Sequence, residues 1–461
     1  MPHPSRGTIA SSPTLSRLHP VRVVFGVAII RASIPLFFAL IVLELLWSQR
    51  AGQRVARLND ALSDISCGVL SQMAGIFDKG LTLGVYIWIG GHATVQQLLP
   101  VVPAWIERAP VAAEGAWPLA TDVPALLSWL VVFLLVDLCY YWSHRLSHEV
   151  NLLWAGHVVH HQSEEYNLAV ALRQATLGKL MTWVFYVPLA LAGVPWRMFV
   201  ACYGINLVYQ FVLHTRAVGR LPRAVEWLMN TPSHHRVHHG VNPKYQDRNY
   251  GGVFIVFDRW FGTFQVEEEE PVYGVTKPLR AWNPIAANLQ VFSQIWRDAR
   301  RATRWRDRWR LLFGRPGWRP PELGAPDVPR EVAADTFVKY DPPLPAPLAA
   351  YASVQFTAAL VAGIVLLQRA ATLPPRELAA AAFFVVLTLT GVGGIFERAR
   401  WARPLETSRL LALGASCVGL LLVAPAMGPV AGAVLGLVAV SLLVLWRYRH
   451  ALTELALAPV M

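Results

Sequence analysis

Residues 125–149 read ALLSWLVVFLLVDLCYYWSHRLSHE, and this stretch decides the fold class. Its first part, Ala125–Trp142, carries one charged residue, Asp137. A helix needs roughly 20 apolar residues to cross the hydrocarbon core of a bilayer. The last part places His144 and His148 four residues apart, on one face of the same helix. The stretch therefore predicts a membrane-spanning helix that ends in a pair of imidazoles.

Five further apolar runs have the same character: Ile29–Trp47, Pro347–Leu367, Ala379–Phe396, Leu410–Met427 and Val430–Trp446. The chain of 461 residues is 54% hydrophobic and 15% charged, whereas soluble domains carry about 25% charged residues. Its mean hydropathy is +0.39. Buried helices of a large soluble protein would explain one or two such runs, but not six. Because backbone hydrogen bonds in lipid must be satisfied within each segment, we expect an all-α integral membrane protein.

The net charge of +12 comes almost entirely from arginine, since the chain has 36 Arg and five Lys. Nine of these Arg lie between Arg297 and Arg319, interleaved with Trp, a mix that suits a helix lying on anionic headgroups. Because Lys and Arg gather in cytoplasmic loops, we expect this zone and the neighbouring His clusters to face the cytoplasm, with no nucleic acid as partner. The Arg- and Ala-rich composition indicates a bacterial inner membrane, or the endoplasmic reticulum if the source is eukaryotic.

These patterns divide the chain into five zones. We expect a disordered basic tail over 1–22, N-terminal transmembrane helices over 23–135 and a histidine-rich catalytic domain over 136–280. An Arg-, Trp- and Pro-rich cytosolic linker follows over 281–346, and C-terminal transmembrane helices occupy 347–461. The whole is a multi-helix transmembrane bundle with a cytosolic, histidine-rich cap that holds two metals.

Two segments inside these zones carry more detailed expectations. Gly68–Gly91 is interrupted by Asp78 and Lys79, so it forms either one helix with a polar break or two short helices. Leu180–Pro195 and Trp196–Leu213 predict a helical hairpin, because Gly193-Val194-Pro195 between them is a typical turn sequence.

The histidines are concentrated: of 14 in the chain, ten lie between His144 and His239. Imidazoles near a bilayer are costly unless they are paired or coordinated. Their spacing is that of metal ligands, with repeated i,i+3 and i,i+4 pairs that share a helical face. One metal takes about four to six ligands, so this number suggests two metals. The candidate ligands are His144, His148, His157, His160, His161, His214, His234, His235, His238 and His239.

Two carboxylates near the first His pair are candidate catalytic-site residues. Glu149 follows His148 directly and could ligate a metal, orient an imidazole or move protons. Asp137 lies seven residues before His144 on the same helical face, nearly two turns deeper. Such a carboxylate either holds a ligand imidazole in place or caps a polar pocket.

The histidine-bearing segments resemble the fatty acid hydroxylase/sterol desaturase superfamily of membrane enzymes, which has an eight-histidine di-iron signature. The resemblance also covers Trp154-Ala-Gly-His157, Ala171-Leu-Arg173-Gln174, Asn249-Tyr250 and Trp260-Phe-Gly-Thr-Phe264. Within the superfamily these motifs resemble the alkylglycerol monooxygenase branch most. The sequence resemblance reaches the level of specific motifs from about Asp137 to Thr276 and is weaker elsewhere.

The resemblance implies a fatty acid hydroxylase-like di-iron domain over 136–280. Carried over by position, the metal-binding histidines fall on His144, His148, His157, His160, His161, His235, His238 and His239, with His214 and His234 as further ligands. The branch's functional glutamate falls on Glu149. The resemblance further implies two iron ions, O2, a membrane lipid substrate, and tetrahydrobiopterin or another external reductant as electron donor.

The implied reaction is hydroxylation of the carbon next to an ether oxygen, after which the hemiacetal collapses to an aldehyde and a glycerol derivative. Iron is preferred to zinc because oxidation of a lipid C–H bond needs an oxidant made from O2, whereas zinc has no redox chemistry. One alternative is hydroxylation or desaturation of a fatty acyl, sterol or carotenoid chain on the same site. A second alternative, a metal transporter or sensor, would need ligands near the middle of the membrane.

Overall fold

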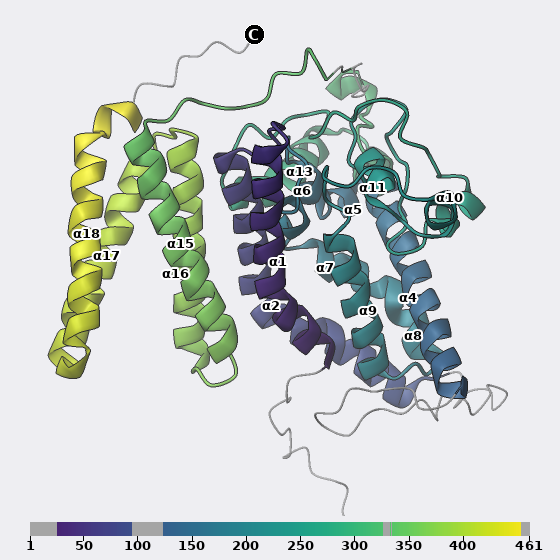
Figure 1. Ribbon diagram of the computed structural model, residues 1–461, viewed down its shortest axis with the longest axis horizontal. Coiled ribbons are helices and arrows are strands. Elements are labelled where there is room, and N and C mark those ends of the chain that lie inside the picture. Colours follow the sequence, from purple (N-terminus) through teal and green to yellow (C-terminus); the bar gives the residue numbers. More distant parts are fainter. Residues whose placement is uncertain (1–24, 95–122, 326–331, 333, 453–461) are drawn as a thin grey trace, which may run out of the picture.

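The computed structural model describes residues 25–94, 123–325, 332 and 334–452, and every regular element in these ranges is a helix (Figure 1). The only β-type pairings in the described residues are isolated bridges, Met229 with Phe254 and Gly240 with Tyr273. The all-α prediction is confirmed. The tail predicted over 1–22 lies outside the described residues.

In the residues that the structure describes, six helices are long and apolar enough to cross a membrane, so the chain is a multi-pass membrane protein. The predicted run Leu410–Met427 is shifted in the structure, because Pro425 cannot continue a helix and the last residues form a separate 3-10 turn, η4. The spans lie in α1 (Phe25–Arg50), α4 (Val123–Glu149), α15 (Ala346–Arg369), α16 (Pro375–Phe396), α17 (Ala402–Val423) and η4 (Pro425–Met427) with α18 (Gly428–Arg447).

α2 (Leu58–His92) is one continuous helix that includes Asp78 and Lys79, which decides between the two readings of this segment. Its first turns are polar yet buried: Asp60, Ser63 and Asp64 are each at most 2% exposed. These side chains meet the cap and not lipid, so α2 connects the membrane region to the histidine-bearing segments.

The predicted hairpin is confirmed in its second arm only. α9 (Trp196–Phe211) is regular. The first arm is broken into α7 (Gly178–Thr182), η2 (Trp183–Tyr186) and α8 (Val187–Leu191). Pro188 lies near the start of α8 and lacks the N–H that a continuous helix would use.

The cap consists of short helices and loops at the upper ends of α4 and α9 and beside the upper ends of α1 and α2 (Figure 1). Its elements are α5 (Asn151–Ala155), α6 (Val158–His161), η1 (Val170–Leu172), α10 (Arg223–Leu228), α11 (Pro232–His238) and α12 (Val256–Phe261).

The region predicted as a linker contains two helices, α13 (Pro284–Arg301) and α14 (Trp305–Phe313), and α13 packs on α2 and α5. Asn283 caps α13 by accepting the Ala286 N–H over 2.7 Å, with Pro284 at the first helical position. This segment is therefore part of the cap.

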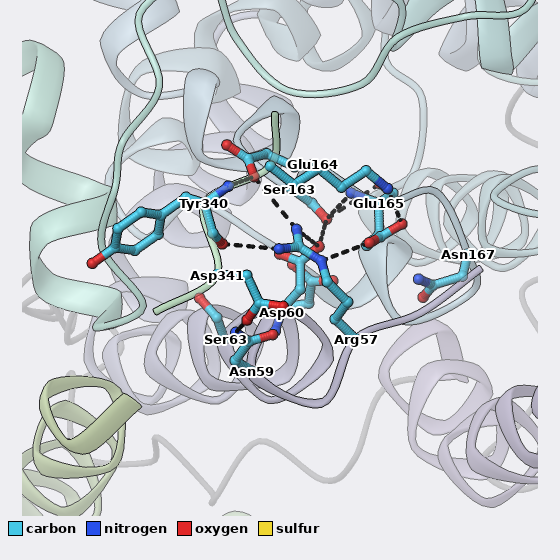
Figure 2. A network of polar contacts seen from close by, with 12 residues as sticks. Arg57, Asn59, Asp60, Ser63, Ser163, Glu164, Glu165, Asn167, Tyr340 and Asp341 are labelled. Carbon is cyan, nitrogen blue, oxygen red and sulfur yellow. Dashed lines mark hydrogen bonds and ion pairs between the residues drawn. The ribbon is translucent and has the colours of Figure 1, made fainter. Parts of the chain in front are cut away.

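A polar network then ties the chain near residue 340 to the cap (Figure 2). The Arg57 guanidinium donates to Glu165 at 2.6 Å and to the Tyr340 carbonyl at 2.8 Å. The Tyr340 N–H donates to Glu164 at 2.7 Å, and Lys339 pairs with Glu165 at 2.6 Å. The network fixes the segment that leads into α15.

α15, α16, α17 and α18 form a bundle of four helices at one side of the molecule (Figure 1), and α15 and α16 pack along α2. It joins the cap where α16 ends: Glu397 accepts the backbone N–H groups of Trp282 and Asn283 over 2.6 and 2.8 Å. A Cβ at Gly393 would lie 2.4 Å from the Asn283 Cα, so glycine permits this close approach. The bundle is thereby attached directly to the start of α13.

Candidate metal centre

Nine of the ten predicted histidine ligands gather in two groups at the centre of the cap. In each group one nitrogen per residue lies within 4.8 Å of all the others. The first group is His144, His148, His157, His161 and His238; the second is His160, His214, His235 and His239.

Neighbouring residues of one helical turn serve different groups. His160 and His161 are adjacent in α6, yet one belongs to each group. In the same way His238 ends α11 and joins the first group, whereas His239 joins the second. The rings of His161 and His239 stack at 4.4 Å between centroids, so the two groups are in direct contact. The arrangement is a single paired centre.

Four imidazoles are oriented by backbone carbonyls. The Nδ1 of His144 faces the Tyr250 oxygen at 2.9 Å, and that of His160 faces the Arg173 oxygen at 3.1 Å. Because a carbonyl oxygen can only accept, each Nδ1 carries the proton and each Nε2 presents a lone pair. This is the usual arrangement of a metal-binding histidine. The other two pairs are His214 with Gln210 and His238 with Arg248, both at 2.9 Å.

One contact indicates a cation directly. His160 Nε2 and His214 Nε2 lie 3.2 Å apart, and the Nδ1 of each ring is committed to a carbonyl. Two lone pairs therefore face each other, an arrangement that needs a positive charge between them. A proton is disfavoured, because burial lowers the pKa of His160 to about 4 and that of His214 well below its usual range.

The nitrogen spacing fits a shared metal ion. Ligands at a right angle around an ion about 2.1 Å away lie about 3.0 Å apart. The pairs His144–His157 and His157–His161 are separated by 3.1 Å between Nε2 atoms, and His214–His235 by 3.0 Å. In addition, the Nε2 atoms of His148, His238 and His239 are buried without a hydrogen-bond partner. Buried polar atoms are otherwise almost always paired, so these atoms fit a metal as their missing partner.

The loop before α12 holds the first group in place. Asp247 and Asn249 both adopt a left-handed conformation, with φ of 57°, and the carbonyls of the alternate residues, Arg248 and Tyr250, face imidazoles. Asp258 accepts the Tyr250 N–H over 2.7 Å and thereby fixes this turn. Sequence reasoning did not assign Asp258 a role; its only signal is an isolated carboxylate in an apolar segment.

Arg173 holds the segment that carries His157, His160 and His161. Its guanidinium is fully buried and donates to the Val159 carbonyl at 2.6 Å and to Asp64 of α2 at 3.1 Å. The sequence singled out Arg173 only as part of the motif Ala171-Leu-Arg173-Gln174, which resembles the superfamily. A buried guanidinium must be paired, and here the pairing joins α2 to the metal centre.

His234 lies outside both groups. Its Nε2 is 3.0 Å from Glu226 Oε2, and the same carboxylate accepts the hydroxyls of Thr231 and Ser233. Adjacent side chains on a helix point about 100° apart, so His235 faces the centre while His234 faces α10. His234 therefore connects α10 to the metal-binding helix.

The two carboxylates occupy different positions. Asp137 is buried, accepts the backbone N–H groups of Val253 and Phe254 at 2.9 Å each, and accepts Asn206 at 2.6 Å. It joins neither histidine group. Glu149 lies at the end of α4, with 27% of its side chain exposed, and pairs with Arg145 at 2.9 Å.

The donor set is all imidazole in both groups. Imidazole suits iron, zinc, copper and nickel, so the geometry fits two adjacent transition-metal ions without choosing the element. The ligands enter at helix ends and in the cap, not midway along a membrane span.

Comparisons with known proteins agree with this arrangement. The fatty acid hydroxylase family model matches residues 129–263, which contain all nine clustered histidines. The chain is 35% identical to an alkylglycerol monooxygenase of Xenopus tropicalis over 81% of this chain and 79% of that protein. It is 36% identical to the human alkylglycerol monooxygenase over 83% of this chain and 81% of that protein.

A more distant match, 25% identical over 32% of this chain and 43% of the relative, is the ornithine lipid hydroxylase OlsE of Rhizobium tropici. No solved structure matches the chain. The long matches and the shared histidine-bearing segment place this chain in the fatty acid hydroxylase superfamily, as a member of the alkylglycerol monooxygenase family.

Proposed function

We propose that this protein is a membrane-bound di-iron monooxygenase that hydroxylates an ether lipid at the carbon next to the ether oxygen. The observation that carries the proposal is the pair of histidine groups, in which Nε2 lone pairs converge without other partners. The relatives named alkylglycerol monooxygenase support the ether lipid as substrate class.

Iron is proposed over zinc because the substrate carbon must be oxidised. Two iron ions would supply the activation of O2 and the oxidation of the C–H bond, a redox task that zinc does not perform. His144, His148, His157, His161 and His238 would hold one ion, and His160, His214, His235 and His239 the other. We do not propose His234 as a ligand, because it pairs with Glu226.

The overall reaction consumes one O2 and two electrons from an external donor. One oxygen atom enters the C–H bond next to the ether oxygen, and the other leaves as water with two protons. The product is a hemiacetal, which collapses to an aldehyde and the free glycerol hydroxyl. A tetrahydropterin, or another reductant of the same two-electron capacity, is proposed as the donor.

The residues of the chain contribute position and enclosure. The backbone carbonyls of Tyr250, Arg173, Gln210 and Arg248 hold four imidazoles in fixed orientations. Enclosure in the cap limits the access of water to the reacting carbon. The apolar membrane helices below the cap would guide an alkyl chain toward the centre.

Glu149 is proposed to move protons between the centre and solvent, because it follows His148 and is partly exposed. In Glu149→Gln we expect slower turnover at unchanged metal content. Unchanged turnover would limit Glu149 to its ion pair with Arg145. Asp137 is proposed only as a positioning residue for the loop at Val253 and Phe254.

We further propose that the cap faces the cytoplasm. The Arg-rich helices α13 and α14 belong to the cap, and positive charge concentrates on the cytoplasmic side of membrane proteins. The membrane would be the bacterial inner membrane, or the endoplasmic reticulum in a eukaryote.

A second candidate is hydroxylation or desaturation of an acyl, sterol or carotenoid chain without cleavage. The match to an ornithine lipid hydroxylase supports this candidate, because that name describes hydroxylation of a different lipid.

Product analysis separates the two candidates. The iron-reconstituted protein in lipid nanodiscs would receive an alkylglycerol, tetrahydropterin and 18O2, with His160→Ala as the matched control. We expect a fatty aldehyde that carries 18O when it is trapped quickly by reduction. An intact chain with an added hydroxyl or double bond would favour the second candidate. No oxidised lipid from any substrate class would overturn both.

A further inference from the structure

Two short helices of the cap, α10 and α12, expose large apolar side chains, and we call them together the lip. Every side chain of α10 except Glu226 is exposed, and Trp227 is 58% exposed. α12 buries its first three residues but exposes Trp260 by 70%. Such a concentration of exposed apolar surface on one face is typical of an interaction site.

Backbone and side-chain contacts join α10 and α12 into one body. The Ile255 N–H donates to the Leu228 carbonyl over 3.1 Å. The Arg259 guanidinium donates to the carbonyls of Glu226 and Trp227, both at 3.0 Å. The exposed tryptophans are therefore held on a fixed frame.

The lip lies against α4 where the lipid-facing surface of this helix ends. Exposed apolar side chains of α4 run from Val123 to Leu135, and Trp142 near the end of the helix is still 36% exposed. About two turns beyond Leu135, Trp142 packs on Phe261 of α12, with ring centroids 5.0 Å apart. Figure 1 shows α10 at the side of the molecule, level with the cap end of α4. The lip thus continues the lipid-facing surface of a membrane-spanning helix.

The loop between α11 and α12 fixes the height of the lip on α4. Asp137, in the middle of α4, accepts the N–H groups of Val253 and Phe254. A Cβ at Gly252 would lie 2.5 Å from Asp137 Oδ1, so the loop and helix are as close as glycine allows. The position of the lip relative to the membrane span is therefore rigid.

The charge around the lip complements anionic lipid headgroups. Arg223 lies about one helical turn before Trp227 on α10, and both are exposed, as is Arg220 in the segment before this helix. The carboxylate of the acidic residue of α10, Glu226, is directed inward, where it accepts the hydroxyl of Ser233 and lies 3.0 Å from His234 Nε2. The outer edge of α10 therefore presents arginine and tryptophan together, the pair that anchors proteins at the membrane–water interface.

From this placement we infer that the lip is a membrane-surface binding element, in which Trp227 and Trp260 insert into the headgroup region of the bilayer that α4 spans. The occupant of the exposed surface is phospholipid of that bilayer. The inference does not depend on the reaction catalysed, because it concerns where the lip lies.

A positional measurement on the full-length, metal-loaded protein tests this inference. Single cysteines at Trp227, Trp260 and, as the control, Val338 would carry a nitrobenzoxadiazole fluorophore in phosphatidylcholine–phosphatidylglycerol vesicles. Val338 is 90% exposed on the segment that is tied to the cap near Tyr340. Leu228→Cys replaces Trp227→Cys if the latter fails to fold, and unsubstituted protein gives the background from its four cysteines.

We expect labels at 227 and 260 to be quenched by nitroxide-bearing lipid and protected from aqueous iodide, with the opposite result at 338. Iodide quenching at 227 and 260 equal to that at 338 would overturn the inference, because the lip would face water. Protection from both quenchers would also overturn it, because a protein surface would then cover the lip.

Discussion

The cap and the C-terminal bundle both bury polar side chains among helices, but they satisfy them differently. In the cap, several imidazole nitrogens of the histidine groups are buried without partners. In the bundle, residues 346–452, which the structure describes throughout, no buried side-chain nitrogen or oxygen lacks a partner. The bundle instead contains a closed network in which Arg409 pairs with Glu406 at 2.7 Å and with Gln355 at 2.8 Å.

Whether the buried polar atoms have partners thus distinguishes a binding centre from a structural network. A closed network needs no additional group, and its role is to specify how α15, α17 and α18 pack through Gln355, Arg409 and Ser441. Converging lone pairs without protons need a cation.

The largest effect is expected from the adjacent residues His160 and His161. Because the two residues belong to different groups, His160→Ala and His161→Ala should each weaken the binding of a different metal ion. Mutation of a residue that only orients a ligand already lowers metal affinity or activity by about 10- to 100-fold. For the loss of a ligand itself we therefore expect turnover to fall by more than about 100-fold. Metal analysis and a product assay measure this, with His92→Ala, on an exposed histidine far along α2, as the control. Full activity in either variant would exclude that group from the centre.

The next largest effect is expected in the bundle. Arg409→Met leaves the buried carboxylate of Glu406 without its partner, which costs about 3–5 kcal/mol. The double variant Glu406→Leu, Arg409→Met should recover most of this stability, because it removes both charges. Thermal unfolding in detergent measures both variants. Metal content per folded chain should stay unchanged, and loss of metal in parallel with Arg409→Met would contradict the separation of the two regions.

A smaller effect is expected at Arg173. In Arg173→Lys the charge remains, but a single ammonium cannot reach Val159, Asp64 and Gln162 together. We expect metal affinity to fall by about 10- to 100-fold, measured by competition with a chelator. The control is Arg319→Lys, which changes an arginine paired with Asp298 away from the centre. Equal affinities in the two variants would mean that Arg173 does not position the ligands.

The smallest effect is expected at Asp137. Asp137→Asn weakens the hydrogen bonds to the Val253 and Phe254 N–H groups, and we expect a loss of about 1–3 kcal/mol in stability. Metal content should be retained, because Asp137 belongs to neither group. A turnover loss above about 100-fold with full metal content and unchanged unfolding temperature would instead assign Asp137 a catalytic role.

Much of this account could be predicted from the sequence because it depends on local periodicity. Apolar runs long enough to span a bilayer do not need tertiary contacts to be recognised, and the described part of the chain contains six candidate spans. The i,i+3 and i,i+4 spacings marked eight of the nine imidazoles that lie together in the two groups, and His214 is the ninth.

The parts that could not be predicted depend on distant partners. Nothing in the local pattern separates His160 from His161, because the division follows from how α11 and the end of α9 meet α6. His234 and His235 are adjacent and point about 100° apart, but which of the two faces the centre depends on how α11 is placed, with Glu226 of α10 beside His234. The Arg and Trp residues between Arg297 and Arg319 suggested a helix on anionic headgroups, but not that α13 begins at Pro284 and packs on α2 and α5, because that packing depends on distant partners.

The central claim is that the two histidine groups hold two iron ions. Elemental mass spectrometry of the detergent-purified protein, after anaerobic reconstitution with ferrous iron, tests it most directly. We expect about two iron ions per chain, and we expect them to be lost in the double variant His148→Ala, His160→Ala, which removes one ligand from each group. Absence of bound iron after reconstitution, or iron that stays in the double variant, would contradict it.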